Sequence, residues 1–527
     1  MESSVLKPHV SSWGYAFFLT VNATSLWGGI FPFLPVEFQT AEVTLTFFLA
    51  QALSFWGAFC ASAFGSYFFP REARRMMVSL SALLVFFGSA CLIGAMYLVD
   101  FTLLLVAGGG VLLGIGCAGM FMLWQRYFAS LPSERGNLRL IVGTALAPLS
   151  YFALYLVPIA LTAYLIPLVF VPLCGLCVAL SVREMKTDQP MFEDVPRQHP
   201  RIYRRVLKNY WRAALCVGSL AFASGVIRGI ALLHEEISMV VNVSSMLGAL
   251  ISAVVLLVLW FRISFRFSLA SVFRVAYPVL VTGFLLLPFL GSGYLNIFAA
   301  VTYMIFSLVL MLMMMQCAQI SRDRGINPVF IYAFFGMIVY LMQSLGFLLG
   351  WLSESIDFMG FDQLALITTV SGYVLGLTLF VASGTLFKQL SPLSSSEVDP
   401  IEFLPLEAHV RQREQPDEGV EVCDAAPMGV DKGKRKARRN RPSTSRDYGI
   451  IRDRISKQCF ALKDLHGLSS RETEVMELIA RGNSMAAIAE RLFISENTVR
   501  THSKHIYAKL NIHKRQDLLD MLGQLSF

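Results

Sequence analysis

A run of polar side chains near the C-terminus has the residue types and spacing needed to contact nucleic acid. Helical periodicity over residues 495–510 places several of them on an outward face. The outward residues are Asn497, Arg500, Thr501, Lys504 and Lys509. Arg500 can give a bidentate contact to guanine, and Asn497 could read adenine. Thr498, His502 and Lys509 are better placed for phosphate oxygens. The alternative for the charged residues is an ordinary solvated helix face.

Neighbouring segments are predicted to form helices that hold this one in place. Ser469 and Glu472 have the spacing of a capping box, which predicts a helix start, and Gly482 predicts the end of that helix. Ser484 and Ser495 can cap the second and third helices. Apolar residues at helical spacing are expected to form the shared core. They are Val475, Leu478, Ile479, Ile488, Leu492, Val499, Ile506 and Leu510, with Leu518, Leu519 and Leu522 on a fourth helix over 513–522.

Nearly all of residues 462–525 resembles the LuxR-type helix-turn-helix family. The matching stretches are 469–472, 488–492, 495–502 and 509–510. The resemblance implies a DNA-binding domain whose third helix enters the major groove. It also implies that the fourth helix pairs two copies of the domain, through Leu518 and Leu519. Packing of these two residues within one copy is the alternative.

Two departures from the family pattern affect this interpretation. Ser470 stands where the family usually has proline at the start of the first helix. This change should lower the stability of the helix only slightly. Ala486 and Ala487 stand where Lys and Glu are usual. The second change removes one expected phosphate contact and one cap partner, so operator affinity is expected to be lower.

The rest of the chain is strongly apolar. The mean hydropathy over the 527 residues is +0.59 and only 15% of residues are charged, compared with about 25% in soluble domains. Twelve apolar blocks are of a length that crosses a hydrocarbon core of about 30 Å. They are 13–36, 43–69, 76–99, 101–124, 140–161, 164–182, 213–233, 239–261, 275–293, 294–317, 328–352 and 363–387. The predicted fold is all-α, with a membrane domain at 1–387, a flexible charged linker at 388–460 and a four-helix DNA-binding domain at 461–527.

Basic residues gather in alternate loops between these blocks. One set of loops contains Arg71, Arg126, Arg262 and Arg322 among others, whereas the other set has no Lys or Arg and carries acidic residues such as Asp100. The positive-inside rule places the first set in the cytoplasm. Because the number of spans is even, both termini are predicted to be cytoplasmic, in a bacterial inner membrane.

The long loop 183–212 divides the spans six and six, a layout that resembles the major facilitator superfamily. Gly65 with residues 71–75 resembles the family's G-x-x-x-D-R-x-G-R-R loop, without its Asp and second Gly. Residues 143–148 resemble its G-x-x-x-G-P motif, with Ala147 in place of the second Gly. The resemblance implies two six-helix halves around a central cavity.

Few ionisable residues lie inside the predicted spans. No Asp or Glu lies well inside one, although proton-coupled carriers commonly need such a group. Arg228 is the clearest intramembrane charge. It either snorkels to the outer surface or contacts an anionic or polar ligand in the cavity. Asn22, Gln51 and Gln343 are further candidates for a ligand site, with helix packing as the alternative for each.

The predicted linker has an acidic stretch followed by the basic run 432–441. Its low hydrophobicity and charge blocks favour disorder. The basic run can contact anionic lipid or, alternatively, DNA phosphates.

These features predict a membrane-bound, DNA-binding transcriptional regulator whose transporter-like domain senses a small molecule. The alternative is a functional secondary transporter that carries a regulatory DNA-binding domain. Expected partners are double-stranded DNA, the lipid bilayer, an unknown small-molecule ligand, a second copy paired through 513–522, and RNA polymerase. No nucleophile–base arrangement, metal cluster or phosphate loop stands out in the sequence. We therefore predict no enzymatic activity, no metal and no cofactor.

Overall fold

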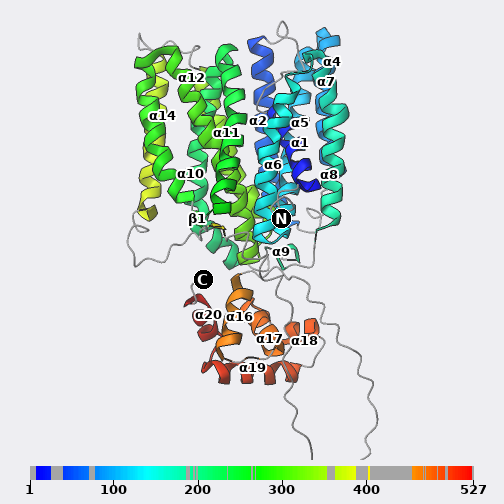
Figure 1. Cartoon of the computed structure of the whole chain (residues 1–527), viewed down its shortest axis with the longest axis vertical. Helices are drawn as coiled ribbons and strands as arrows, with labels where there is room; N and C mark the ends of the chain where they lie inside the picture. Colours follow the sequence, from blue (N-terminus) through cyan, green and yellow to red (C-terminus); the bar gives the residue numbers. More distant parts are fainter. Residues whose placement is uncertain are drawn as a thin grey trace, which may run out of the picture.

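The protein, described from a computed structural model, is almost entirely helical. Figure 1 shows a bundle of long helices with a group of shorter helices beyond one end. The described residues are 8–24, 40–69, 78–185, 190–193, 196, 200–233, 235–262, 265–267, 269–352, 363–386, 401–403, 454–466, 468, 470–483, 485–492 and 496–524. The predicted all-α class is confirmed, apart from two three-residue strands.

The first half of the bundle runs from α1 to α8. Its elements are α1 (Val10–Asn22), α2 (Ala41–Phe68), α4 (Val78–Tyr97), η4 (Val99–Phe101), α5 (Thr102–Ser130), α6 (Ser133–Leu154), α7 (Ile159–Leu165), η5 (Ile166–Phe170) and α8 (Val171–Arg183). Thr40 caps α2, because its hydroxyl accepts the N–H of Val43 at 3.3 Å. The π turn η5 contains Pro167, which has no N–H for the preceding turn. Helices α7 and α8 therefore continue through η5 as one span.

The second half runs from α10 to α14, after the short α9 (Pro190–Glu193). Its helices are α10 (Pro200–Leu233), α11 (Glu235–Arg262), α12 (Leu269–Arg324), α13 (Pro328–Trp351) and α14 (Gln363–Leu386). Helix α12 folds back on itself. The rings of Phe284 and Phe298 are 4.9 Å apart, whereas a straight helix would separate these positions by roughly 21 Å. Its two antiparallel limbs correspond to the predicted spans 275–293 and 294–317.

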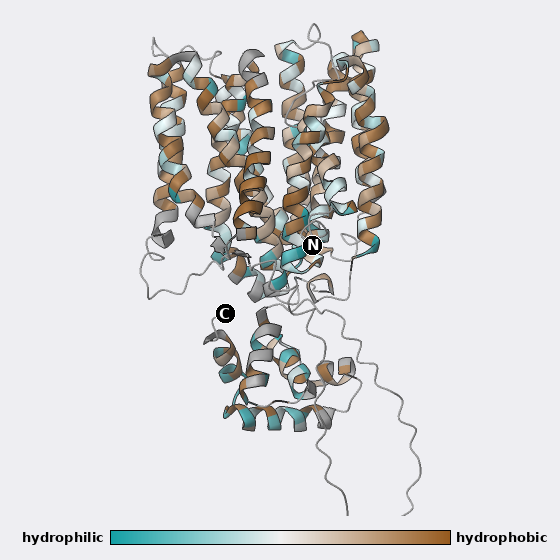
Figure 2. Ribbon diagram, viewed as in Figure 1, coloured by the Kyte–Doolittle hydropathy of each residue, from teal (hydrophilic) through white to brown (hydrophobic). Residues whose placement is uncertain are grey.

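Eleven helical segments of the described chain are long and apolar enough to cross a membrane. The first of the twelve predicted spans is described only through α1, because 25–39 lie outside the described residues. Figure 2 shows mostly hydrophobic residues along the long helices. Large apolar side chains such as Phe289, which is 82% exposed, cover the outside of the bundle. Such a surface suits lipid rather than water, so the chain is a multi-pass membrane protein.

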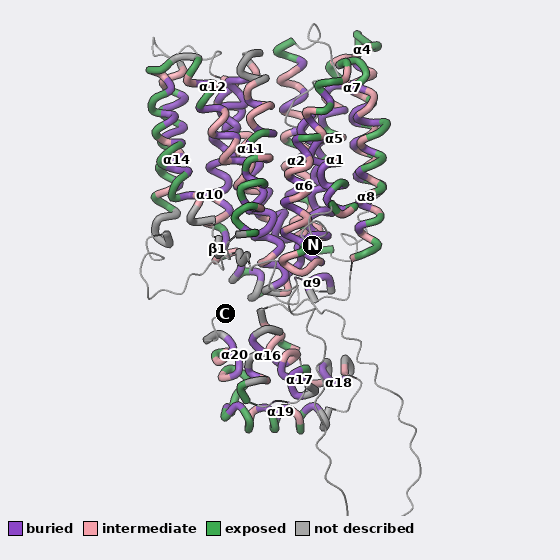
Figure 3. Tube along the Cα trace, viewed as in Figure 1, coloured by how far each residue is buried: buried purple, intermediate pink, exposed green. Residues whose placement is uncertain are grey.

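The two halves meet most extensively along two helix pairs, α2 with α13 and α6 with α11, and α5 also contacts α12 and α13. Figure 3 shows that the buried residues concentrate toward the middle of the bundle. At the end of the bundle nearest the C-terminal helices, Arg322 of α12 donates from Nη1 to the carbonyls of Phe128 (3.1 Å) and Leu131 (3.2 Å). These bonds join the halves at that end.

Helices α10 and α13 approach each other closely through glycines on both. A Cβ added to Gly225 would lie 2.2 Å from the carbonyl oxygen of Gln343, and one added to Gly346 would lie 2.1 Å from that of Phe222. Gly229 and Gly350, one turn further along each helix, are equally confined. Small residues spaced four apart let membrane helices pack backbone against backbone. This contact fixes the segment of α10 that carries Arg228.

A short antiparallel ladder connects the predicted linker to the bundle. Strand β1 (Phe265–Phe267) lies between α11 and α12, and β2 (Ile401–Phe403) follows α14. Phe265 is paired with Phe403, and Arg266 with Glu402. Residues 401–403 of the predicted linker thus have regular structure, whereas the basic run 432–441 lies outside the described residues.

The C-terminal helices form a compact group with its own core. They are α16 (Arg454–His466), α17 (Ser470–Ala480), α18 (Met485–Leu492), α19 (Glu496–Leu510) and α20 (Arg515–Gln524). Four were predicted; α16 is additional, and its Cys459 and Leu462 are buried in the core. Most predicted core residues are buried, whereas Leu478, Leu492 and Leu519 are partly exposed.

Candidate DNA-binding surface and membrane cavity

The ends of the C-terminal helices are set by backbone geometry. Gly482 has a φ of +96°, and its N–H donates to the carbonyl of Ile479 at 3.1 Å. This left-handed residue ends α17, as the sequence predicted. At the start of α20, the carboxylate of Asp517 accepts the backbone N–H groups of His513 (3.2 Å) and Lys514 (3.0 Å), and these bonds lower its pKa. The predicted caps Ser469, Ser484 and Ser495 lie outside the described residues.

Helix α19 separates an apolar face from a polar one. Val499, Ile506 and Leu510 are buried against the other helices. The predicted DNA-contacting residues Arg500, Thr501, Lys504 and Lys509 are exposed, and His502 is half-buried. Figure 1 shows α19 on the side of the C-terminal group farthest from the membrane helices. The side chains of the two remaining candidates, Asn497 and Thr498, lie outside the described residues.

Lys509 makes a contact that the sequence did not predict. Its Nζ lies 2.8 Å from Oε2 of Glu472, whose side chain is only 7% exposed. The pair links α19 to the first turn of α17. Lys509 therefore stabilises the domain, and a phosphate would have to compete with Glu472 for its ammonium group.

A cavity of about 140 Å³ lies between the two halves of the membrane bundle. Helices α1, α2, α5 and α6 line it from the first half, and α10 to α13 line it from the second. Three of the predicted ligand residues, Arg228, Gln51 and Gln343, line this cavity. The fourth, Asn22, does not: it is fully buried and donates to the carbonyl of Phe18 at 2.9 Å.

Arg228 faces the cavity rather than the membrane surface, because it is only 7% exposed. Its Nη1 donates to Oδ1 of Asn242 at 2.7 Å. Its guanidinium carbon lies 5.4 Å from the centre of the Phe48 ring. Its Nη2 has no hydrogen-bond partner among the described residues. Arg228 is also the one charged side chain in the described lining of the cavity.

Sequence reasoning missed several lining residues. Asn242 and Phe48 hold the Arg228 side chain from α11 and α2, respectively. Tyr303 lines the same cavity and donates to the carbonyl of Ser224 at 3.0 Å. A polar residue inside an apolar span, such as Asn242, was an available signal. Phe48 and Tyr303 had none, since aromatic residues are common throughout these spans.

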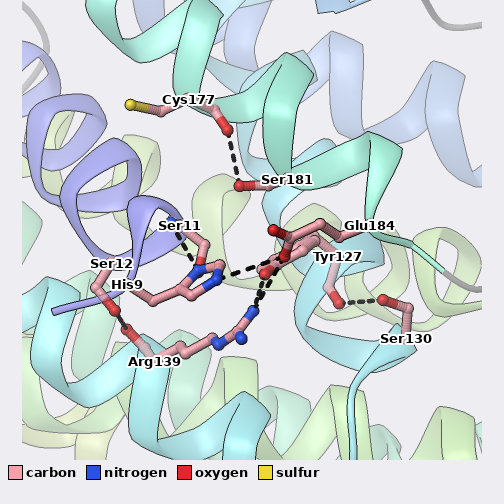
Figure 4. Close-up of polar contacts among 9 residues, drawn as sticks. All are labelled: His9, Ser11, Ser12, Tyr127, Ser130, Arg139, Cys177, Ser181 and Glu184. Carbon is pink, nitrogen blue, oxygen red and sulfur yellow. Dashed lines mark hydrogen bonds and ion pairs between the residues drawn. The ribbon is translucent and has the colours of Figure 1, made fainter. Parts of the chain in front are cut away.

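A second polar group lies at one end of the first half (Figure 4). The carboxylate of Glu184 lies 3.5 Å from His9 Nε2 and 3.6 Å from Arg139 Nη1, and Arg139 also donates to the hydroxyl of Tyr127. Burial and the positive charge of Arg139 lower the pKa of His9, while Glu184 acts in the opposite direction. These contacts join the start of α1 to α5, α6 and the end of α8. They therefore stabilise the packing of the first half.

Comparison with known proteins decides what the C-terminal helices are. The profile described as bacterial regulatory proteins, luxR family, matches residues 466–522. These residues form a LuxR-family DNA-binding domain. A transcriptional regulator of Pseudomonas aeruginosa is 46% identical over 56 residues, which is 11% of this chain and 27% of that protein. The oxygen regulatory protein NreC of Staphylococcus carnosus is 45% identical over 53 residues, 10% of this chain and 24% of NreC. The chain therefore spans about a quarter of the length of these relatives.

The membrane helices are similar to solved transporters. A bacterial homologue of the iron transporter ferroportin, in an outward-facing state, aligns with a TM-score of 0.51 and 12% identity over 71% of this chain and 98% of that one. The major facilitator superfamily transporter FucP aligns with a TM-score of 0.47 and 13% identity over 71% and 97%. At this identity the likeness concerns the fold alone. The predicted transporter-like fold is confirmed.

The LuxR family assignment makes α19 the recognition helix and α18 its partner in the helix-turn-helix. Arg500, Thr501 and Lys504 lie on the exposed face of α19. The predicted dimer residue Leu518 is fully buried in the core of a single domain, which is the alternative packing given above.

Proposed function

We propose that the chain is a membrane-bound transcriptional regulator in which the transporter-like domain senses a small molecule. The observation that carries this proposal is the cavity between the two halves, in the same chain as a LuxR-family domain. The domain limits 1–387, 388–460 and 461–527 belong to the proposal. It places the chain in a bacterial inner membrane with both termini in the cytoplasm, where a DNA-binding domain can reach DNA.

The position of the cavity supports a switching role. Its lining comes from both halves, so a bound molecule would touch α2 and α6 on one side and α10 and α11 on the other. A ligand shifts an equilibrium between two arrangements only by its differential affinity for them, and a site shared by two movable halves supplies such a difference. The halves are joined through Arg322 at the end nearest the DNA-binding domain, which favours entry from the opposite, outer end.

The proposal also includes two protein partners, a second copy of the chain and RNA polymerase. LuxR-family pairing through residues 513–522 would have to use side chains other than the buried Leu518, such as the half-buried Leu519. Contact with RNA polymerase would act at the promoter. Neither partner is needed for the sensing step in the membrane.

A functional secondary transporter with a regulatory DNA-binding domain is the alternative, and the transporter-like fold favours it. The described lining of the cavity contains no Asp or Glu, the groups that proton-coupled carriers commonly use. The two functions differ in one measurable respect, because only a transporter accumulates the compound that regulates transcription.

The test is genome-wide mapping of bound DNA in cells that express either the full chain or the segment 454–527. We expect both proteins to occupy the same sites, and only the full chain to change its occupancy when an extracellular compound is added. Proteoliposomes containing the full chain should not accumulate that compound. A ligand response by the segment alone would contradict sensing by the membrane domain, and gradient-driven uptake would favour the transporter.

A further inference from the structure

We propose that the cavity binds a small organic monocarboxylate, with the carboxylate at Arg228 and a compact apolar body against the aromatic wall. This inference rests on the proposed sensing function and names the class of ligand that the membrane domain would detect.

The charge of the cavity indicates an anion. Arg228 is buried, and no carboxylate of the described residues lies in the lining to balance it. The uncharged Asn242 side chain accepts a hydrogen bond only from Nη1 of Arg228, and Nη2 of Arg228 has no hydrogen-bond partner among the described residues. A buried guanidinium is costly unless it is paired with a charge and hydrogen-bonded. A carboxylate that enters the cavity would supply both.

A second unsatisfied donor lies one helical turn from the Arg228 contact. Phe48 of α2 packs against the guanidinium, and Gln51 follows it three residues later on the same helix. Gln51 is 4% exposed, and its Nε2 has no hydrogen-bond partner among the described residues. Arg228 and Gln51 both line the cavity. A carboxylate has two oxygens and only accepts hydrogen bonds, so it can serve both donors at once.

The rest of the lining selects an apolar body of limited size. Phe55, Phe121, Phe347 and Met311 line the cavity beside the polar groups. Its volume of about 140 Å³ is close to the roughly 150 Å³ of an apolar cavity that holds benzene. The cavity therefore fits a single ring or a short branched chain.

The same lining argues against a more highly charged ligand. The described lining contains no Lys or His beside Arg228. A phosphate ester or a dicarboxylate would bring a second negative charge into an apolar site without a cation to pair with it, and that would be strongly unfavourable.

Binding to the full chain in lipid nanodiscs tests the proposal. The probes are phenylacetate and 3-methylbutanoate, with phenylacetamide and 3-methylbutanamide as uncharged compounds of the same shape. We expect at least one acid to raise the unfolding temperature while its amide has little effect. Arg228→Gln should weaken binding of the acid by about tenfold to a hundredfold, because a charged hydrogen bond is lost. Arg274→Gln, which removes an exposed arginine outside the cavity, should leave binding unchanged.

Gln51→Leu provides a second variant if Arg228→Gln does not fold, and it should weaken acid binding by a smaller factor. No binding of either acid, equal binding of acid and amide, or undiminished binding by folded Gln51→Leu and Arg228→Gln proteins would each overturn the proposal. The proposed sensing function can fail separately. Acid binding without any change in DNA occupancy would contradict sensing, whereas a DNA response to the amides alone would contradict the ligand class.

Discussion

At the scale of single residues, Arg500 is the side chain that we propose reads the DNA sequence most directly. It is exposed on the recognition helix α19, one turn from its N-terminal end. We expect Arg500→Ala in the segment 454–527 to cost about 1–3 kcal/mol of operator binding and to relax base preference at one position. Selection of bound sequences from a random pool measures both effects.

Lys514→Ala is the matched control, because it removes an exposed positive charge from outside α19. It should weaken binding equally on all sequences, or not at all. If the wild-type and Arg500→Ala segments select the same DNA sequences, Arg500 does not read a base.

Lys509 should affect stability as well as DNA binding. Its removal leaves the buried carboxylate of Glu472 without this partner. We expect Lys509→Met to lower the free energy of unfolding of the segment 454–527 by about 1–3 kcal/mol. Thermal unfolding followed by circular dichroism measures this loss. If Lys509 acted only on phosphate, unfolding would not change and only the affinity for DNA would fall.

Asp517 gives the domain a pH dependence of known sign. Two backbone N–H groups hold its pKa below the ordinary value of 3.8. Its stabilisation is therefore fully present above that value and is lost as the pH falls through the lower, folded pKa. Subtracting the unfolding free energy of Asp517→Asn from that of wild type should give a difference that shrinks below about pH 4. Asp520→Asn is the control, because the Asp520 carboxylate accepts from the Gln516 side chain instead of the backbone. A difference independent of pH would contradict this account.

The sequence predicted the chemistry of these residues better than their contacts. Arg500 and Lys504 lie on the exposed face because helical periodicity alone decides that. The Lys509–Glu472 pair joins two helices, and so depends on tertiary packing that local spacing does not contain. Arg228 was recognised as an intramembrane charge, but its direction depends on Asn242 and Phe48 from two other helices.

At the scale of elements, the contact between α10 and α13 should be the least tolerant of added volume. Gly346→Ala would place a methyl group against the backbone of Phe222, so the helices must separate. Overpacking of this kind costs about 1–3 kcal/mol. We expect the purified full chain to unfold at a lower temperature. Gly376→Ala on α14 is the control, because no described atom of another helix lies within 4 Å of its new methyl group. Equal melting temperatures for the two variants would contradict the close contact.

Element positions were predicted well where hydrophobic blocks are long. The blocks and alternating loop charges anticipated the helices of both halves, because an apolar segment of about 20 residues has few other stable states in lipid. The tight turn within α12 leaves little sequence signal between its limbs, although the two blocks were separated correctly. Helix α16 was missed because most of it precedes residues 462–525, which resemble the family, and it contributes only a few core residues, among them Cys459 and Leu462.

At the scale of the whole molecule, the cavity and the DNA-binding domain are connected in two places. The ladder between β1 and β2 attaches the segment after α14 to the connection between α11 and α12, and α16 contacts α12. Helices α11 and α12 also line the cavity. If ligand binding shifts α11 and α12, the shift can therefore reach the DNA-binding domain through the β1–β2 ladder and the α12–α16 contact, as well as through the linker. Local sequence signals could not predict this arrangement, because three-residue strands far apart in the chain have no recognisable pattern.

The central claim is that occupancy of the membrane cavity changes DNA binding by the same chain. The most direct measurement is operator affinity of the full chain in nanodiscs, with and without a cavity ligand, on a sequence selected by the segment 454–527. The account predicts that the ligand changes the affinity of the full chain several-fold, and leaves the affinity of the segment and of the Arg228→Gln chain unchanged. Equal affinity of the full chain with and without a ligand shown to occupy the cavity would contradict it.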